Sequence, residues 1–491
     1  MKNIQKSIFD FKLWLILFIA SNFIFAFYHI TFFWGNHDWD WVKGTTQVLQ
    51  LNTGMFEGRY AKFILNVGLF DGQVLPILNN LVAFALLSLG AVWLTSYWQI
   101  KNFTARLLVA LMPLCAPYIL GWLYFPINIL GNFSAVALVS YGLIATKREQ
   151  WQFKIISIVC FLLALGVYPS TIEMMFVCWC VHSVLEPKIK PKVIIKSFSL
   201  ILVSLIIFKT MIYLLGKLNI VYSGHYNMQM PTVLELVRRI PETIELAFSQ
   251  LIITLPFFSL NYKIMAATLF ILAIVCTFKK WFWWSMALAA TVLSSFFTIA
   301  PEETMYMPRI NFYGINFLIA GAVAVLLAQQ HLYRNLGVAL SLFLIWGGIK
   351  ANIEATKVWY LGQKAEIQLV ERISNKIGQQ SLDTILVPVI AGELPLRPRY
   401  YATPYQHKSP YILNGSLLVR HIPSGMFNFY ATTPFLYNYS QIAELTPEIY
   451  QFLDEAQRSW PAPESLFIDE KYVIILLTDE GVAAIKSQLP Y

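Results

Sequence analysis

The sequence has little charge for its size. Only 13% of its 491 residues are charged, against about 25% in soluble domains, while 57% are hydrophobic. This composition argues against a soluble enzyme and favours apolar segments that cross a bilayer. The net charge of +9 comes from lysines and arginines dispersed in short clusters between apolar runs. Because they do not gather on one polar face, nucleic-acid binding is not expected.

Cysteine is scarce and familiar catalytic motifs are absent. All five cysteines lie inside apolar runs, and Cys178-Trp-Cys180 lacks the second ligand pair that a zinc site needs. No disulfide framework is therefore expected. The sequence has no HExxH, GxSxG or P-loop pattern. It also has no convincing internal repeat, which weighs against transporters built from duplicated halves.

Long apolar runs dominate the first 350 residues. Each could cross a hydrocarbon core about 30 Å thick, although some are short. They lie near 13–33, 74–98, 104–124, 128–146, 153–169, 171–185, 193–215, 264–278, 281–300, 311–329 and 335–350. We therefore predict a mainly α, polytopic transmembrane domain over residues 1–355, with about eleven spans.

The basic clusters predict the orientation of these spans. With a cytoplasmic N-terminus all of them fall on one side, as the positive-inside rule requires. The clusters are Lys2 to Lys12, Lys101 to Arg106, Lys147-Arg148 with Lys154, Lys188 to Lys196, Lys279-Lys280 and His331 to Arg334. Segment 240–262 is also apolar, but counting it as a span would put Lys279-Lys280 outside. It is predicted to be a re-entrant or interfacial piece, broken by Pro256.

The chain becomes polar after Lys350. Strand-like runs follow at 384–390 and 472–477, with turn signals such as Asn414-Gly415 between them. Residues 356–491 are therefore predicted to form a small C-terminal α/β domain outside the membrane. By the same orientation this domain is periplasmic.

A dense polar constellation follows the first apolar run. Asp38 and Asp40 alternate with tryptophans, and Glu57, Arg59 and Lys62 come shortly after them. Carboxylates beside cations at a membrane surface could deprotonate a hydroxyl and hold an anionic phosphate. The alternative is an interfacial helix that tryptophans anchor and whose charges only face water.

Two further clusters fall on the same side. Glu173 follows the turn at Tyr168 and enters an apolar run, where a carboxylate is costly and usually faces a cavity. Its alternative role is that of a first-turn helix acid. Tyr306 and Arg309 lie in the loop before another run, where an arginine opposes the positive-inside trend and favours an anionic partner. An internal salt bridge is the alternative for Arg309.

These residues resemble a known family. The acidic pair Asp38 and Asp40, the downstream Gly58-Arg59, the turn Gly166-Val-Tyr168-Pro-Ser170 and many spans before a periplasmic domain are similar to the type II glucosyltransferases that modify bacterial O-antigens. That family resembles the wider GT-C superfamily of membrane glycosyltransferases. The resemblance covers roughly the first 350 residues in layout.

The resemblance implies a reaction and its partners. A sugar, usually glucose, would pass from an undecaprenyl-phosphate carrier to lipopolysaccharide O-antigen or a related surface polysaccharide, on the periplasmic face of the bacterial inner membrane. In GT-C enzymes an acid in the first outside loop is typically the catalytic base, and that position matches Asp38 or Asp40. The family's acidic pair is commonly adjacent, whereas Trp39 separates these two, so the choice of base stays open.

Chemistry assigns roles to the remaining residues. The leaving phosphate is already a stable anion, so the protein must supply mainly a base for the acceptor hydroxyl and cations for the phosphate. The cations expected to bind the donor phosphate are Arg59, Lys62 and Arg309. The residues expected to contact the substrates are Glu57, Tyr168, Glu173 and Tyr306. Some GT-C enzymes use a divalent metal, and Asp38 with Asp40 could ligate Mg²⁺ or Mn²⁺.

Three other functions compete with this hypothesis. A transporter or flippase of the same lipid-linked sugar would be expected to carry charges deep in several spans, and few occur apart from Glu173 and Lys209. A polymerase or ligase of lipid-linked glycans has its large loop between spans, whereas the polar segment here is terminal. A non-catalytic assembly protein would tolerate alanine at Asp38 and Asp40.

Overall fold

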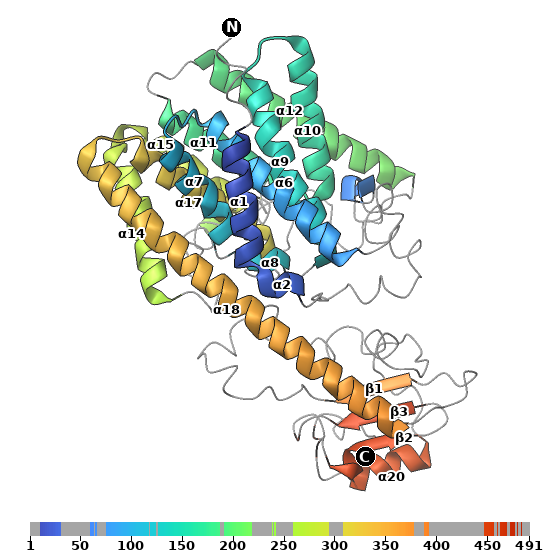
Figure 1. Cartoon of the computed structure of the whole chain (residues 1–491). Coiled ribbons are helices and arrows are strands. Elements are labelled where there is room, and N and C mark those ends of the chain that lie inside the picture. Colours follow the sequence, from blue (N-terminus) through green and yellow to red (C-terminus); the bar gives the residue numbers. More distant parts are fainter. Residues whose placement is uncertain are drawn as a thin grey trace. The chain divides into compact units, whose positions relative to one another are not determined.

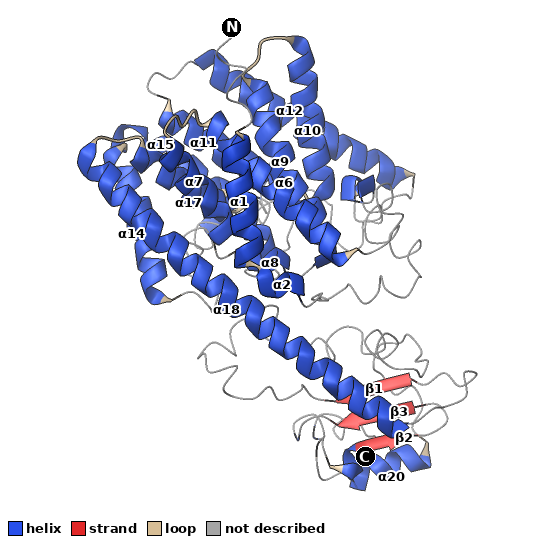
Figure 2. Ribbon diagram, viewed as in Figure 1, coloured by secondary structure: helices blue, strands red, loops and turns tan. Residues whose placement is uncertain are grey.

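The computed structural model describes part of the chain in detail. The described residues are 10–30, 59–62, 64–65, 75–116, 118–123, 126–186, 191–218, 238, 240–241, 259–293, 308–377, 387–391, 446–455, 459, 462–468, 472–476, 479 and 483. These residues are mostly helical, and their strands occur only after residue 386 (Figure 2). The chain divides into two compact units, Met1–His29 with Gln47–Ala355 and Ile30–Thr46 with Thr356–Tyr491.

The first unit is a helical bundle (Figure 1). Helices α6, α9, α10 and α12 pack one against the next, and α11 packs against α15 and α17. The elements of the bundle are α1 (Phe11–Ile24), α2 (Ala26–Ile30), α6 (Pro76–Tyr97), α7 (Phe103–Cys115), α8 (Ile119–Leu123), α9 (Pro126–Thr146), α10 (Trp151–Val167), α11 (Thr171–Leu185), α12 (Pro191–Lys217), α14 (Leu260–Cys276), the 3-10 helix η3 (Phe278–Lys280), α15 (Trp281–Ala290), α17 (Pro308–Leu327) and the start of α18 (His331–Ile377).

Every predicted apolar run contains a helix, but fewer of these helices reach the length of a membrane span. Four are long and apolar enough: Ile77–Tyr97, Asn128–Thr146, Pro191–Lys217 and His331–Lys357. The pair Leu260–Cys276 and Phe278–Ala290, bent by 94°, makes a fifth if it counts as one span. Five shorter apolar helices of 10–17 residues accompany them among the described residues. The count of about eleven spans therefore stays a prediction. Segment 240–262 lies largely outside the described residues.

The run 104–124 is not one continuous helix, contrary to the prediction. Helix α7 ends at Cys115, the backbone turns extended at Ala116, and α8 begins at Ile119. Helix α18 packs against this break, where the amide of Asn352 donates a hydrogen bond of 3.3 Å to the carbonyl of Cys115. A Cβ atom added at Gly348 would collide with the same carbonyl. A carbonyl freed by the end of α7 thus gains a partner from a distant helix.

Helix α18 is much longer than predicted. The apolar run was expected to end at Lys350, yet the helix continues to Ile377. Residues 351–377 contain no proline and are rich in alanine, glutamate, lysine, glutamine and leucine, which are good helix formers in water. The end of an apolar run therefore does not mark the end of this helix.

The second unit contains a three-stranded sheet in the order β1-β3-β2. Strand β1 (Val387–Ala391) pairs in parallel with β3 (Tyr472–Leu476), and β2 (Leu466–Ile468) pairs antiparallel with it. All five residues of β3 are buried, as expected for a central strand. Helix α20 (Pro447–Glu455) buries Ile449 and Leu453. Strand β3 begins where the predicted run 472–477 begins and ends one residue before it, and β1 overlaps the predicted run 384–390. A separate α/β domain over 356–491 stays a prediction.

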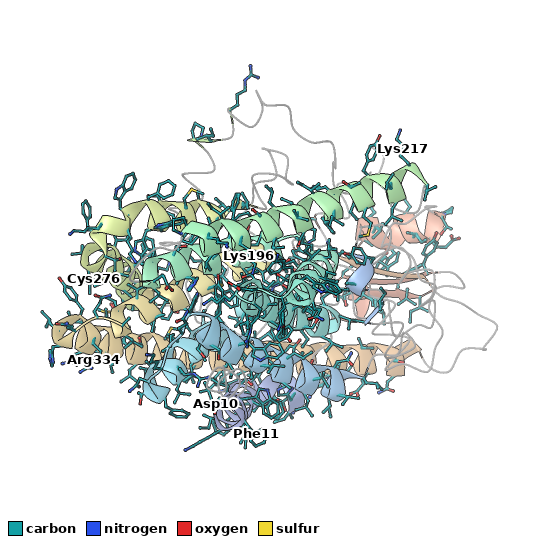
Figure 3. The ribbon with its side chains drawn as sticks, turned by 90° about the horizontal axis from the view of Figure 1, so that it is seen from above. Asp10, Phe11, Lys196, Lys217, Cys276 and Arg334 are labelled. Atoms are coloured by element: carbon teal, nitrogen blue, oxygen red, sulfur yellow. The ribbon has the colours of Figure 1, made fainter. Side chains whose placement is uncertain are left out.

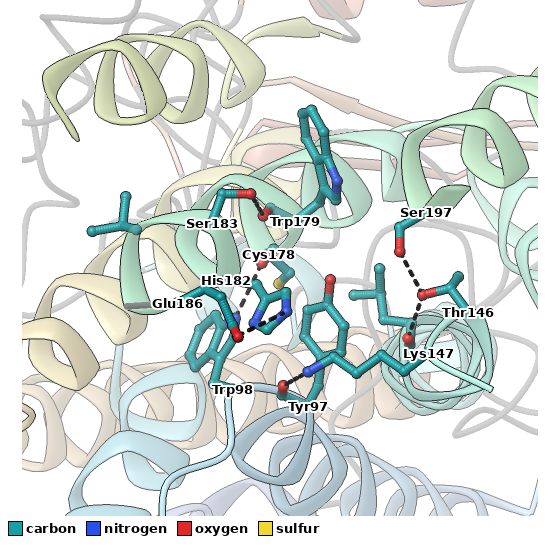
Figure 4. Close-up of polar contacts among 12 residues, drawn as sticks. Tyr97, Trp98, Thr146, Lys147, Cys178, Trp179, His182, Ser183, Glu186 and Ser197 are labelled. Carbon is teal, nitrogen blue, oxygen red and sulfur yellow. Dashed lines mark hydrogen bonds and ion pairs between the residues drawn. The ribbon is translucent and has the colours of Figure 1, made fainter. Parts of the chain in front are cut away.

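Lysines close the helix ends at one end of the bundle, which we call the lysine end. The ammonium of Lys147, just after α9, donates to the carbonyl of Tyr97, the last residue of α6 (Figure 4). It also lies 4.4 Å from the centroid of the Tyr97 ring. Burial lowers the pKa of Lys147 to about 8, and the charge of Glu186 opposes this shift. Lys147 is therefore still mostly protonated at neutral pH and can bind the negative end of the α6 dipole.

Lys280 does the same for α11. Its ammonium donates to the carbonyls of Ser183 at 3.4 Å, Val184 at 2.6 Å and Glu186. These carbonyls belong to the last turn of α11 and the residue after it, where no further helical N–H is available. Lys196 donates in the same way to the carbonyl of Arg148, after α9. The lysine end is thus fixed by bonds between helices that are distant in sequence.

Candidate functional site

The structure describes four of the nine predicted site residues with their side chains. Asp38, Asp40, Glu57 and Tyr306 lie outside the described residues. Arg309 lies in the first turn of α17, and its side chain is not described. The other four, Arg59, Lys62, Tyr168 and Glu173, lie at the end of the bundle opposite the lysine end, where α10 ends and α11 begins. We call this the site end.

Tyr60 docks the short segment 59–62 onto helix α10. Its hydroxyl donates a hydrogen bond of 2.6 Å to the carbonyl of Leu162. Its ring lies so close to Gly166 that a Cβ atom added there would be 2.7 Å from both Cε atoms. The ring also lies 6.4 Å from that of Phe208 on α12. Tyr60 therefore fixes the position of the two cations on either side of it, Arg59 and Lys62.

Arg59 lies over an aromatic cluster. Its guanidinium is 4.9 Å from the centroid of the Tyr168 ring. The cluster consists of Trp122 on α8, Tyr168 after α10 and Tyr313 on α17. Trp122 meets Tyr168 edge to face at 4.8 Å, and Tyr313 stacks on Tyr168 at 6.4 Å. All three rings are buried, so the cluster holds the Tyr168 ring in place beneath the guanidinium of Arg59, and the guanidinium can bind an anionic group.

Tyr313 holds the aromatic cluster against helix α9. Its hydroxyl lies 3.0 Å from Oδ1 and 3.1 Å from the backbone oxygen of Asn132, both within hydrogen-bond distance. The Asn132 amide in turn donates to the carbonyl of Asn128 at 2.6 Å. Sequence reasoning missed Trp122, Asn132 and Tyr313. The available signal was the pair of asparagines four residues apart in an apolar helix, which places two polar groups on one face.

Lys62 is a buried cation, only 6% exposed. A Cβ atom added at Gly131 on α9 would lie 3.9 Å from the Cγ atom of Lys62. The same added Cβ would lie 3.3 Å from a Cγ atom of Val167, the last residue of α10. The stem of Lys62 thus passes between α9 and the end of α10. A buried ammonium is retained only where anionic or polar groups face it, which suits a phosphate-binding role.

Glu173 is fully buried in the first turn of α11. Its backbone N–H donates to the carbonyl of Ser170 at 3.0 Å, and the N–H of Thr171 closes the preceding turn on the carbonyl of Tyr168 at 3.1 Å. The positive end of the α11 dipole favours a carboxylate at this position. Both roles expected from the sequence, a first-turn helix acid and a site residue, are compatible with this placement.

No group of three histidine, cysteine, aspartate or glutamate residues that could hold a metal ion occurs among the described residues. Asp38 and Asp40, the predicted ligands of Mg²⁺ or Mn²⁺, are outside that set. The metal therefore stays a prediction that depends on these two carboxylates.

The fold and the candidate site together define a class: a helical protein with helices apolar enough to cross a membrane and a cationic and aromatic cluster at one end of them. Within that class, residues 45–280, a little under half of the chain, match the model of the family described as glucosyl transferase GtrII. This match confirms the resemblance to type II O-antigen glucosyltransferases and indicates a glycosyltransferase. No curated protein and no solved structure matches the chain.

Replacing Gly166 with alanine is expected to destabilise the site end. The new methyl group would overlap the Tyr60 ring, and overpacking of this kind costs about 1–3 kcal/mol. The apparent melting temperature of the purified protein should fall. Gly216→Ala is the matched control, since no atom lies within 4 Å of its added Cβ and alanine is favoured over glycine in a helix by up to about 1 kcal/mol. Equal melting temperatures for the two variants would contradict the docking of Tyr60 on Gly166.

Proposed function

We propose that this protein transfers glucose from undecaprenyl-phosphate-glucose to lipopolysaccharide O-antigen, or to a related surface glycan, on the periplasmic face of the bacterial inner membrane. The main support is the placement of Arg59 and Lys62 beside the aromatic cluster at the site end, within the region that matches the glucosyl transferase family. Two cations near each other, one of them held over a fixed aromatic ring, suit the phosphate of such a donor.

The proposed topology puts the site end in the periplasm. Lys147, Lys196 and Lys280 lie at the opposite end, where the positive-inside rule favours the cytoplasm. About eleven spans and a periplasmic segment after residue 355 complete this topology. The site then faces the compartment in which a surface glycan is modified.

The reaction needs few groups from the protein. Asp38 or Asp40 would accept the proton of the acceptor hydroxyl as its oxygen attacks the anomeric carbon of glucose. The bond between that carbon and the phosphate oxygen breaks, and polyprenyl phosphate leaves as an anion. Arg59, Lys62 and Arg309 would stabilise the charge that develops on it. The substrates would be held by Glu57, Tyr168, Glu173 and Tyr306. A Mg²⁺ or Mn²⁺ ion, if one is bound, would lie at Asp38 and Asp40.

Sugar transfer by the purified protein tests this proposal. The protein in lipid nanodiscs is expected to transfer glucose from synthetic undecaprenyl-phosphate-glucose to an O-antigen acceptor, and not from UDP-glucose. Parallel reactions with EDTA and with added Mg²⁺ or Mn²⁺ test the metal. Transfer from UDP-glucose would contradict the lipid donor. No transfer from polyprenyl-phosphate glucose, mannose or galactose would favour a transporter, a flippase or a polymerase of lipid-linked glycans.

A further inference from the structure

Helix α12 carries a lysine in an apolar setting. Its exposed side chains include Leu202, Ile206 and Leu214, so most of the helix surface is available to lipid. Lys209 lies among these residues and is half-buried. Within the part of the chain that the structure describes, no hydrogen bond or ion pair joins its ammonium to another residue. A charge at membrane depth is costly, so an unpaired one indicates a functional site with an anionic partner.

The depth of Lys209 can be estimated from the helix itself. At about 1.5 Å per residue, Lys209 lies roughly 20 Å along the axis from Lys196, which is held at the lysine end. Lys217, at the far end of α12 in Figure 3, is roughly 12 Å further on. Lys209 is therefore in the half of the bilayer that belongs to the site end. Its ammonium can extend along the helix toward the headgroups.

Lys209 is also next to the candidate site. The preceding residue, Phe208, is 3% exposed. The centroid of its ring lies 6.4 Å from the centroid of the Tyr60 ring. Tyr60 lies between Arg59 and Lys62 in the chain and is docked on α10 by its bond to Leu162. The contact between Phe208 and Tyr60 thus joins α12 to the segment that carries the two site cations.

The surface of α12 is open at Gly216, toward the end of the helix. Gly216 comes two turns after Lys209 on the same helix face, and nothing lies within 4 Å of the position that its Cβ would occupy. Beside it, the ammonium of Lys217 lies 5.6 Å from the centroid of the Tyr213 ring. Tyr213 is 63% exposed. The exposed surface of α12 is therefore apolar around Lys209 and carries a second cation, Lys217, toward its end.

We propose that Lys209 binds the phosphate of the polyprenyl-phosphate carrier as the lipid moves from the bilayer to Arg59 and Lys62. This inference rests on the proposed function, since only a lipid-linked donor has to arrive from the side. The phosphate of such a carrier follows directly on a single isoprenoid chain, without a glycerol backbone. It can therefore lie along one helix at the depth of Lys209, with the isoprenoid chain against the exposed leucines and isoleucines.

Binding of undecaprenyl phosphate without sugar tests this role independently of activity. The affinity of the protein in nanodiscs can be followed by the quenching of its tryptophan fluorescence. Lys209→Met keeps the length of the side chain but removes the charge, and it is expected to weaken binding about tenfold. Lys209→Arg should bind like the parent. The matched control is Lys192→Met, an exposed lysine near the other end of α12, which should leave binding unchanged.

Transfer kinetics provide a second measurement. For Lys209→Met the KM for undecaprenyl-phosphate-glucose should rise about tenfold while kcat changes less than about twofold, because Lys209 acts before the chemical step. Gly216→Phe, which fills the open space two turns from Lys209 on the same helix face, should raise the same KM. The elution profile of each variant on size exclusion shows that it is folded, and methionine in an apolar helix should not impair folding.

The outcomes separate this inference from the proposed function. If the parent neither binds undecaprenyl phosphate nor transfers glucose, the proposed function fails and the role of Lys209 fails with it. If the parent does both and Lys209→Met equals it in affinity and KM, only the role of Lys209 is wrong. Equal competition by phosphatidylglycerol would also overturn it, because the site would then bind phospholipids in general.

Discussion

Replacing Asp38 or Asp40 with asparagine is expected to lower the turnover of glucose transfer by roughly 10²–10⁴-fold for the residue that acts as the base. Asparagine keeps the size of the side chain and its hydrogen-bonding oxygen but cannot accept the proton of the acceptor hydroxyl. The effect should appear in kcat, with little change in the KM for the lipid donor, because the proton is transferred only at the chemical step.

The two variants serve as controls for each other. They differ in position by two residues, so a general disturbance of the segment would affect both alike. A large loss in one and a smaller loss in the other would identify the base. Restoration of activity by added Mg²⁺ or Mn²⁺ in the more active variant would assign that residue to a metal ion. Full activity in both variants would contradict the proposed mechanism and favour an assembly protein, which needs neither carboxylate.

The helices of the bundle could be predicted because each rests on a local property. A run of apolar residues specifies a buried or lipid-exposed helix wherever it packs. Helices α6, α9, α10, α11 and α12 accordingly begin and end within two residues of the predicted runs. The break between α7 and α8 was not predicted, although Pro117 signals it, because a proline disfavours a helical conformation of the residue before it and Ala116 is extended. The partners of the freed Cys115 carbonyl could not be predicted, because Gly348 and Asn352 approach it from a distant helix.

The basic clusters were interpreted as topology signals, and the structure gives three of their lysines a second role. Lys147, Lys196 and Lys280 each bind backbone carbonyls of another segment. The sequence predicts that they lie on one side of the membrane, and the structure places them at one end of the bundle. The sequence could not predict their partners, because the carbonyl at the end of a helix leaves no trace in the sequence.

Only part of the candidate site could be predicted from the sequence, for the same reason. Arg59 and Lys62 stood out because they follow the acidic pair in a dense polar segment, and Tyr168 because it lies in the turn that ends an apolar run. Trp122 and Tyr313 did not, since aromatic residues are common near membrane interfaces and nothing distinguishes these two. Their importance comes from ring contacts with Tyr168 that bring together α8, the end of α10 and α17.

Replacing Arg59 with glutamine is expected to lower kcat by roughly 10²–10³-fold, the usual cost of removing one group that stabilises the developing charge. Arg59→Lys should recover only part of this loss. Lysine keeps the charge, but it lacks the planar guanidinium that lies over the Tyr168 ring. Initial rates over a range of undecaprenyl-phosphate-glucose concentrations measure both effects.

The ring of Tyr168 can be tested separately from its hydroxyl. Tyr168→Phe keeps the ring beneath Arg59 and should retain most of the activity. Tyr168→Leu removes the aromatic face and should lower kcat as Arg59→Gln does, but by a smaller factor. In the double variant Arg59→Gln with Tyr168→Leu, the losses should be less than additive, because the ring acts by positioning the guanidinium. Strictly additive losses would show that Tyr168 contacts the substrate independently of Arg59.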